Sequence, residues 1–250
     1  MKFREFGLPT GRTIVLLHGG GLSWWSLQPV IGQFASAFHV VTPVIDGHGE
    51  AAEDTFISIE DSARKLLAYL DEHHGGRVFA LAGLSVGAQL VVELLSLRED
   101  VAQFAVVESA LVCPLRMTAR LASAQALFYG LIRQRWFSRL QAKALCLPAS
   151  MLDLYYADSV KMQVQSLVNL TRSNAAYVIK PSLSRTQAHM LILVGEREIP
   201  VMRKSARRLS EVLPNSMLLV LPGLKHGEFS LRYPAEYAAA LQKFFKDSIR

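Results

Sequence analysis

Ser85 is the residue of this chain whose surroundings most favour nucleophilic chemistry. It lies in the pentapeptide Gly83-Leu84-Ser85-Val86-Gly87, between the apolar run 78–82 and the helix-like run 88–97. Glycine on both sides removes side chains that would clash in a sharp strand-to-helix turn, so such a turn can hold the serine hydroxyl exposed. The pattern predicts a nucleophilic serine.

His226 is the best candidate for the base that this serine would need, because a serine hydroxyl is a weak nucleophile at neutral pH. It follows the apolar run 217–221 and lies in a loop beside Gly227. A position after an expected strand favours His226 as the general base. The alternative is a surface histidine in a turn.

A carboxylate should orient the base and stabilise its charge. The loop 195–200, after the apolar run 190–194, offers Glu198 and, as a weaker choice, Glu196. Glu108 competes with both, since an acid next to buried valines would need a partner. We favour Glu198 and keep Glu108 as the alternative; each could also be a helix-capping or surface glutamate.

Acyl transfer also needs hydrogen-bond donors for the developing oxyanion, and backbone N–H groups serve this purpose. The N–H of Val86, directly after the serine, is one candidate. The N–H of Gly20, in the segment His18-Gly19-Gly20-Gly21, is the other. We expect the imidazole of His18 to brace this loop rather than to react.

Strand-like and helix-like segments alternate along most of the chain, which predicts a mostly parallel sheet flanked by helices. The candidate residues all follow expected strands, and the chemistry of open α/β sheets lies beyond the carboxyl ends of the strands. The alternation stops between residues 114 and 185, where helix formers dominate. The expected strands are 13–17, 38–44, 77–82, 104–107, 190–194 and 217–221, and the expected helices are 25–34, 58–74, 86–97, 202–213 and 234–246.

Composition limits the class of protein. The 250 residues are 51% hydrophobic, which fits one domain with a sizeable core. The net charge is +6, but the densest basic cluster, 203–208, falls on an expected amphipathic helix, so no nucleic-acid partner is expected. No apolar stretch reaches the roughly 18 residues of a membrane span, and no segment resembles a signal peptide. We expect a cytoplasmic protein, in which Cys113 and Cys146 form neither a disulfide framework nor a metal site.

These elements together resemble the α/β-hydrolase superfamily over nearly the whole chain. The order serine, acid, histidine is that of the family. The loop 18–21 resembles its oxyanion loop, and 46–49 resembles its common loop after the next strand. The segment 194–200 is similar to the acid loop, although Glu198 stands where an aspartate is usual. The family's first antiparallel strands are expected to be missing or reduced to residues 3–6.

The resemblance implies an α/β-hydrolase core over residues 1–113 and 186–250, with a helical cap over 114–185. Trp24 and the cap residue Trp136 are candidates for the substrate pocket, with packing as the alternative role. Serine members need no cofactor and cleave small-molecule esters, thioesters, amides or certain C–C bonds. The prediction is a serine hydrolase of a small or medium carboxylic ester. A non-catalytic ligand-binding protein on the same scaffold is the alternative from another class.

Overall fold

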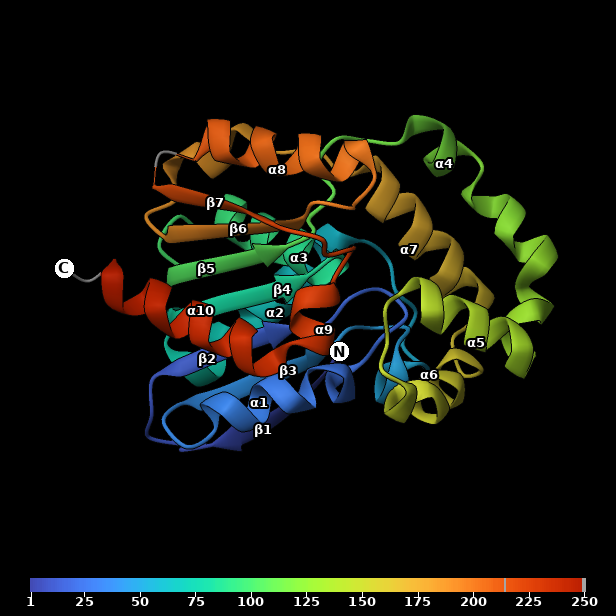
Figure 1. Cartoon of the computed structure of the whole chain (residues 1–250), viewed down its shortest axis with the longest axis horizontal. Helices are drawn as coiled ribbons and strands as arrows, with labels where there is room; N and C mark the ends of the chain where they lie inside the picture. Colours follow the sequence, from blue (N-terminus) through green and yellow to red (C-terminus); the bar gives the residue numbers. More distant parts are fainter. Residues whose placement is uncertain (214, 249–250) are drawn as a thin grey trace.

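The computed structural model describes residues 1–213 and 215–248. In this part of the chain a seven-stranded sheet, ordered β1-β3-β2-β4-β5-β6-β7, forms the centre of the molecule (Figure 1). β1 runs antiparallel to β3, and all other neighbours are parallel. The predicted α/β class is therefore confirmed. The strands are β1 (Lys2–Gly7), β2 (Thr13–Leu17), β3 (His39–Val44), β4 (Val78–Leu84), β5 (Ala102–Glu108), β6 (His189–Gly195) and β7 (Ser216–Leu221).

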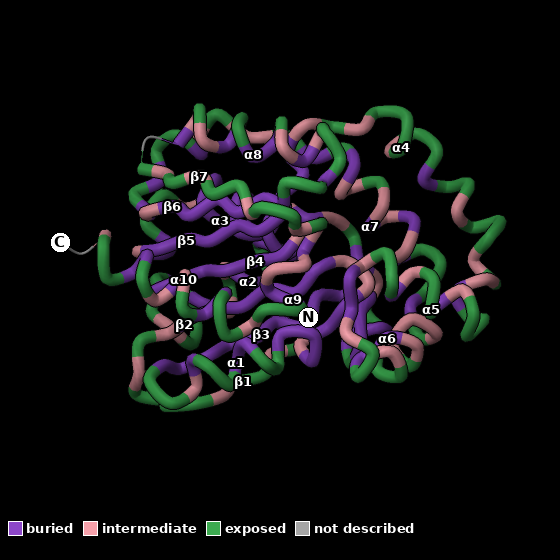
Figure 2. The backbone as a smooth tube through the Cα atoms, in the orientation of Figure 1, coloured by how far each residue is buried: buried purple, intermediate pink, exposed green. Residues whose placement is uncertain are grey.

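Alternate residues of the central strands face two separate helical layers, because successive side chains of a strand point to opposite faces. Ile14 and Leu16 of β2 belong to the cluster that α1 (Gln28–Phe34) and α10 (Pro234–Asp247) cover. Val15 and Leu17 belong to the cluster on the other face, under α2 (Ile59–His74), α3 (Val86–Leu97) and α8 (Pro200–Val212). Figure 2 shows the central strands buried between these layers.

Local signals in the sequence explain where several elements begin and end. The Ser58 side chain accepts a hydrogen bond from the Asp61 N–H and caps α2, and Gly75 ends this helix in the left-handed conformation at φ 62°. The helix expected over 25–34 is instead a 3₁₀ turn, Trp24–Leu27, followed by α1. Pro29 explains the break, because proline lacks an N–H and suits the first turn of a helix but not its interior.

The chain between β5 and β6 forms helices that lie at the carboxyl ends of the strands (Figure 1). Several polar contacts join it to the rest of the molecule, among them two that bind its side chains to buried or partly buried partners. The indole N–H of Trp25 donates to Asp158 Oδ2 at 2.7 Å, and the Tyr177 hydroxyl donates to Glu93 Oε2 at 3.1 Å. The elements are α4 (Arg116–Arg120), a 3₁₀ helix (Ala122–Arg133), α5 (Arg135–Ala144), α6 (Leu152–Ser159), α7 (Val164–Ala176) and two short 3₁₀ turns (Ala149–Met151 and Pro181–Arg185).

None of the helices in the described ranges combines the length and the apolar character needed to cross a bilayer.

Candidate active site

Ser85 occupies a strained turn between β4 and α3. Its backbone has φ 54° and ψ −111°, a conformation that non-glycine residues rarely adopt and that is typically maintained by surrounding structure at functional sites. The Ser85 N–H donates to the Glu108 carbonyl at 2.9 Å, which ties the turn to β5. A Cβ on Gly83 would lie 2.3 Å from the Gly87 carbonyl oxygen, and a Cβ on Gly87 would lie 2.3 Å from that of Leu17. Only glycine therefore fits at positions 83 and 87, because neighbouring backbone atoms lie where a Cβ would be.

His226 lies in the loop after β7 and contacts Ser85 and Glu198 at once. Its Nε2 is 3.0 Å from Ser85 Oγ, and its Nδ1 is 2.8 Å from Glu198 Oε2. Because an ionised carboxylate can only accept, Nδ1 carries a proton in this arrangement. In the neutral ring Nε2 is then free to accept the proton of the serine hydroxyl.

Glu198 is buried in the loop after β6, and both of its carboxylate oxygens take part in hydrogen bonds. Oε1 accepts hydrogen bonds from the Gly195 N–H at 2.8 Å and from the Ser109 hydroxyl at 2.7 Å, while Oε2 serves His226. Burial alone would raise the pKa of Glu198, but these hydrogen bonds and the nearby imidazole lower the pKa below its ordinary value. The carboxylate is thus held ionised beside the ring that it orients.

Ser109 is a site residue that the sequence reasoning missed. It follows β5 with a left-handed backbone, φ 59°. Besides donating to Glu198, its hydroxyl accepts the Gly227 N–H at 3.3 Å, so it joins the loop that carries Glu198 to the residue after His226. A polar residue directly after the Val107-Glu108 strand end was the available signal.

Glu108, the alternative acid, is not hydrogen-bonded to His226 among the described residues. Its Oε1 accepts the Ser230 N–H at 3.3 Å, and its Oε2 is buried without a partner in the described chain. Burial raises the pKa of Glu108 to about 7. Glu196, the weaker candidate, is exposed and accepts the Gly223 N–H instead. Of the three acids, the structure brings only Glu198 to the imidazole.

Gly20 and Val86 lie against each other beside the serine. A Cβ on Gly20 would be 3.1 Å from Val86 Cγ2. Within residues 1–213 and 215–248, neither N–H donates to a protein acceptor. His18 braces the loop: its Nδ1 lies 2.9 Å from the Gly19 carbonyl, and its Nε2 accepts the Ile45 N–H at 3.2 Å. Burial lowers the pKa of His18 to about 3, so the ring is neutral in this role.

The two tryptophans expected at the pocket are not brought there. The Trp24 indole N–H donates to Glu50 Oε1 at 3.0 Å. The Arg4 guanidinium lies over the Trp24 ring, with Cζ 4.6 Å from the centre of that ring. Trp136 lies on α5 and is exposed. Neither indole lines the cavities beside Ser85 and His226, because a place in the sequence next to residues 18–21 or within 114–185 does not determine which way a side chain points.

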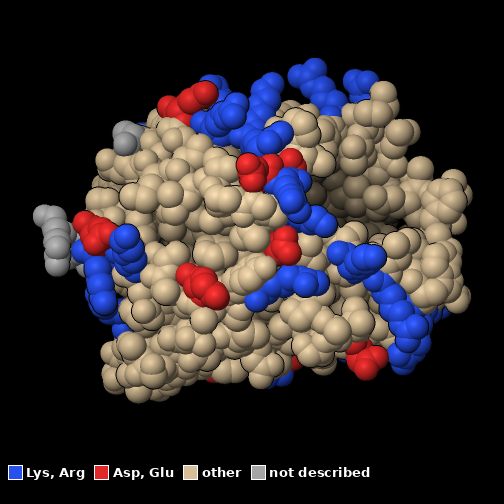
Figure 3. Space-filling model, in the orientation of Figure 1, with Lys and Arg blue, Asp and Glu red and all other residues tan. Residues whose placement is uncertain are grey.

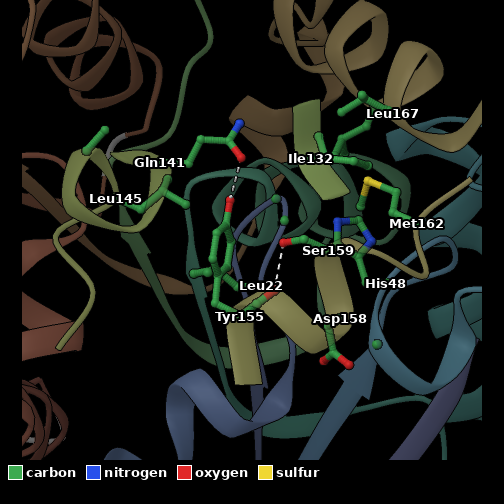
Figure 4. Close-up of a pocket in the computed structure, with 15 residues that line it drawn as sticks. Leu22, His48, Ile132, Gln141, Leu145, Tyr155, Asp158, Ser159, Met162 and Leu167 are labelled. Atoms are coloured by element: carbon green, nitrogen blue, oxygen red, sulfur yellow. Dashed lines mark hydrogen bonds between the residues drawn. The ribbon is translucent and has the colours of Figure 1, made fainter. Parts of the chain in front are cut away.

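Two cavities of similar size flank the serine and the histidine. One, of about 350 Å³, is lined by both and by Glu198, with Arg197 and Lys225 on its wall. The other, of about 310 Å³, begins at Gly20 and is mostly apolar (Figure 4). A narrow space lined by Ser85, His226 and Gly20 lies between them. Figure 3 shows the molecule hollowed beside the helices that lie between β5 and β6, with Lys and Arg side chains around the hollow.

His48 lines the second cavity and is buried (Figure 4). Its Nδ1 lies 3.0 Å from the Asp46 carbonyl, which fixes the proton on that nitrogen. Burial lowers the pKa of His48, which favours the neutral ring. No group of three or more His, Cys, Asp or Glu side chains in the described ranges could hold a metal ion.

The model of the alpha/beta hydrolase family matches residues 14–240. Because that match covers most of the chain, this protein belongs to the alpha/beta hydrolase family. An AB hydrolase superfamily protein from Gibberella zeae is 28% identical over 91 residues, which are 35% of this chain and 32% of that protein. This match spans only about a third of the length of the curated relative.

Solved structures show the same fold at low sequence identity. A bromoperoxidase from Bacillus anthracis is similar with a TM-score of 0.82 and 18% identity, over 98% of this chain and 94% of that one. An esterase from Thermogutta terrifontis, with malate bound, is similar with a TM-score of 0.78 and 16% identity, over 98% and 93% of the two chains. Their different names agree with the rule that this fold supports several chemistries.

Proposed function

We propose that this protein is a serine hydrolase that cleaves a small or medium carboxylic ester through an acyl-enzyme. The observation that carries the proposal is the unbroken path of hydrogen bonds from Ser85 Oγ through both ring nitrogens of His226 to Glu198, with distances of 3.0 and 2.8 Å. A path of this kind serves to remove the serine proton and to stabilise the imidazolium that results.

In the proposed mechanism, Ser85 Oγ attacks the ester carbonyl while His226 Nε2 takes the hydroxyl proton. The N–H groups of Gly20 and Val86 donate to the oxygen of the tetrahedral intermediate. His226 then protonates the leaving alcohol, and the acyl group remains on Ser85. Water, deprotonated by the same Nε2, attacks the acyl-enzyme. The carboxylic acid is released, and His226 returns the proton to Ser85 Oγ. No step requires a cofactor.

The two cavities suit the two sides of an ester. The apolar cavity beyond Gly20 fits a short or medium hydrocarbon chain, and the cavity with Arg197 and Lys225 fits the other group. We further propose that residues 114–185 act as a cap that closes both cavities, because Ile132 and Ala144 of this segment contribute to their walls. An esterase also stands among the structural neighbours, which agrees with the proposal.

Labelling with a fluorophosphonate tests the nucleophile. We expect the wild-type protein to be labelled and Ser85→Ala, folded by circular dichroism, to stay unlabelled. Folded wild-type protein that resists labelling would favour the non-catalytic ligand-binding alternative. A panel of esters of varied acyl length, thioesters, amides and C–C substrates then tests which kind of bond the protein cleaves. Higher kcat/KM on thioesters, amides or C–C substrates than on every ester would replace the ester proposal.

A further inference from the structure

The outer side of the segment from α4 to α5 exposes large apolar side chains. Leu127 is 82% exposed and Trp136 is 60% exposed. A single exposed apolar side chain is ordinary, but several in one segment mark an interaction surface. Figure 2 shows that much of this edge of the molecule, around the labels α4 and α5, is exposed. We call this set the cap surface: Met117, Leu121, Leu127, Phe128, Trp136 and Leu140.

The same segment carries only positive charge. No acidic residue occurs in the sequence between Glu108 and Asp153, whereas this stretch contains six basic residues. One of the six, Arg135, forms an ion pair with Asp153 at 3.1 Å. The others leave a surplus of positive charge beside the apolar side chains. The six are Arg116, Arg120, Arg133, Arg135, Arg139 and Lys143.

Helix α5 shows how the two kinds of side chain are arranged. Trp136 and Leu140 are four residues apart and therefore share one face of the helix, and Arg139 and Lys143 share the adjacent face. Both faces are exposed, while Ala142 is buried on the side toward the protein. The helix thus carries an apolar stripe beside a basic stripe, and both point away from the core.

We propose that the cap surface docks this protein on an anionic lipid bilayer. Apolar and aromatic side chains next to Lys and Arg are the composition by which amphipathic helices lie in the headgroup region, where the rings and alkyl chains enter the lipid and the cations meet its phosphates. A fluid bilayer accepts projecting side chains of any outline. A second copy of the chain is the poorer occupant, because the surplus of basic residues on each copy would repel across the contact.

Docking in this way would bring the cavity wall next to the lipid. Ala144, four residues after Leu140 at the end of α5, lines both cavities, and Leu145, just after the helix, lines the apolar one. A lipophilic ester dissolved in the bilayer would then lie close to the cap. This consequence rests on the proposed function, whereas the docking itself does not.

Vesicle binding tests the docking without any turnover, and Ser85→Ala can be used throughout. We expect the full chain to co-sediment with vesicles of phosphatidylcholine containing about a third phosphatidylglycerol, more weakly with pure phosphatidylcholine, and less as salt is raised. The indole emission should shift to shorter wavelength on binding, and Trp136→Phe should abolish most of that shift. Wild-type protein that stays in the supernatant of the anionic vesicles at low salt overturns the proposal.

A matched pair of charge variants separates this surface from the overall positive charge. Arg139→Gln with Lys143→Gln should weaken vesicle binding by about 25-fold, since each basic side chain near an anionic bilayer contributes roughly fivefold. Lys204→Gln with Arg207→Gln removes the same charge from exposed positions of α8 and should change binding less than twofold. Equal losses in the two variants contradict a dedicated surface.

Two further outcomes would assign the surface to a different occupant. Sedimentation that shows a wild-type dimer and a Trp136→Ser monomer would make the cap surface a contact between copies. Binding to soluble polyglutamate as tight as binding to the vesicles would make it a site for an acidic polypeptide.

Discussion

The Ser109 hydroxyl donates to Oε1 of Glu198 at 2.7 Å, using the carboxylate oxygen that His226 leaves free. The acid is therefore held from two sides, by β5 through Ser109 and by its own loop through the Gly195 N–H. Such outer partners hold a carboxylate in the orientation that its imidazole partner needs.

Replacing Ser109 should impair the orientation of Glu198. We expect Ser109→Ala to lower kcat by about tenfold with little change in KM, because a positioned partner rather than a substrate contact is lost. Ser109→Gly serves as the control, since glycine also lacks the hydroxyl but accepts the positive φ without strain. Steady-state kinetics on an activated ester gives both constants. If Ser109→Gly retains full kcat while Ser109→Ala does not, backbone strain and not the hydroxyl is responsible.

The choice between the two acids can be measured directly. We expect Glu198→Gln to lower kcat by up to ~10⁴-fold, because the amide cannot hold the imidazole and its charge as a carboxylate does. Glu108→Gln should stay within a few-fold of wild type, since Glu108 is hydrogen-bonded to Ser230 and not to the ring. A severe loss in Glu108→Gln beside a near-normal Glu198→Gln would reverse the assignment.

Glu108 should make the stability of the protein depend on pH. Its pKa is raised to about 7, whereas an unfolded glutamate titrates near ~4.3, so the folded state binds the extra proton between these values. Stability from this group is fully present below the lower value and is lost as pH rises through the upper one, a loss of about 4 kcal/mol in total. Glu108→Gln should lack this loss.

Urea unfolding at pH 5 and pH 8 tests that prediction. The other groups titrate alike in the wild-type protein and in Glu108→Gln, so the difference between the two pH dependences isolates Glu108. The same change in unfolding free energy from pH 5 to pH 8 in both proteins would show that Glu108 titrates normally.

A methyl group at Gly87 should be poorly tolerated. Its Cβ would lie 2.3 Å from the Leu17 carbonyl oxygen and 2.6 Å from that of His18, and neither backbone can move freely. We expect Gly87→Ala to lower the free energy of unfolding by about 3 kcal/mol or to prevent folding. The control is Gly32→Ala in α1, where nothing lies within 4 Å of the added Cβ. There alanine should stabilise the helix by up to ~1 kcal/mol.

Denaturant midpoints of the two alanine variants give the comparison, with soluble yield as the readout if Gly87→Ala does not fold. Equal stability of both variants would mean that the turn at Ser85 is free to relax.

The sequence by itself determined the sheet, its flanking helices and the turn at Ser85. Short-range sterics encode these features: β-branched runs favour strands, Ser58 and Gly75 mark the ends of α2, and glycines permit the turn. The sequence also placed Ser85, Glu198 and His226 at the carboxyl ends of strands, where neighbours in the sheet meet.

Only the tertiary structure decided which side chains touch. Glu198 hydrogen-bonds to His226. Glu108 instead pairs with Leu193 in the sheet, and its buried carboxylate accepts the Ser230 N–H. The position of Ser109 beside Glu198 and the outward direction of Trp136 were equally invisible in the sequence. The reason is physical: local pattern determines backbone conformation, but the direction and partners of a side chain depend on the register of distant strands and on the packing of the segment that covers them.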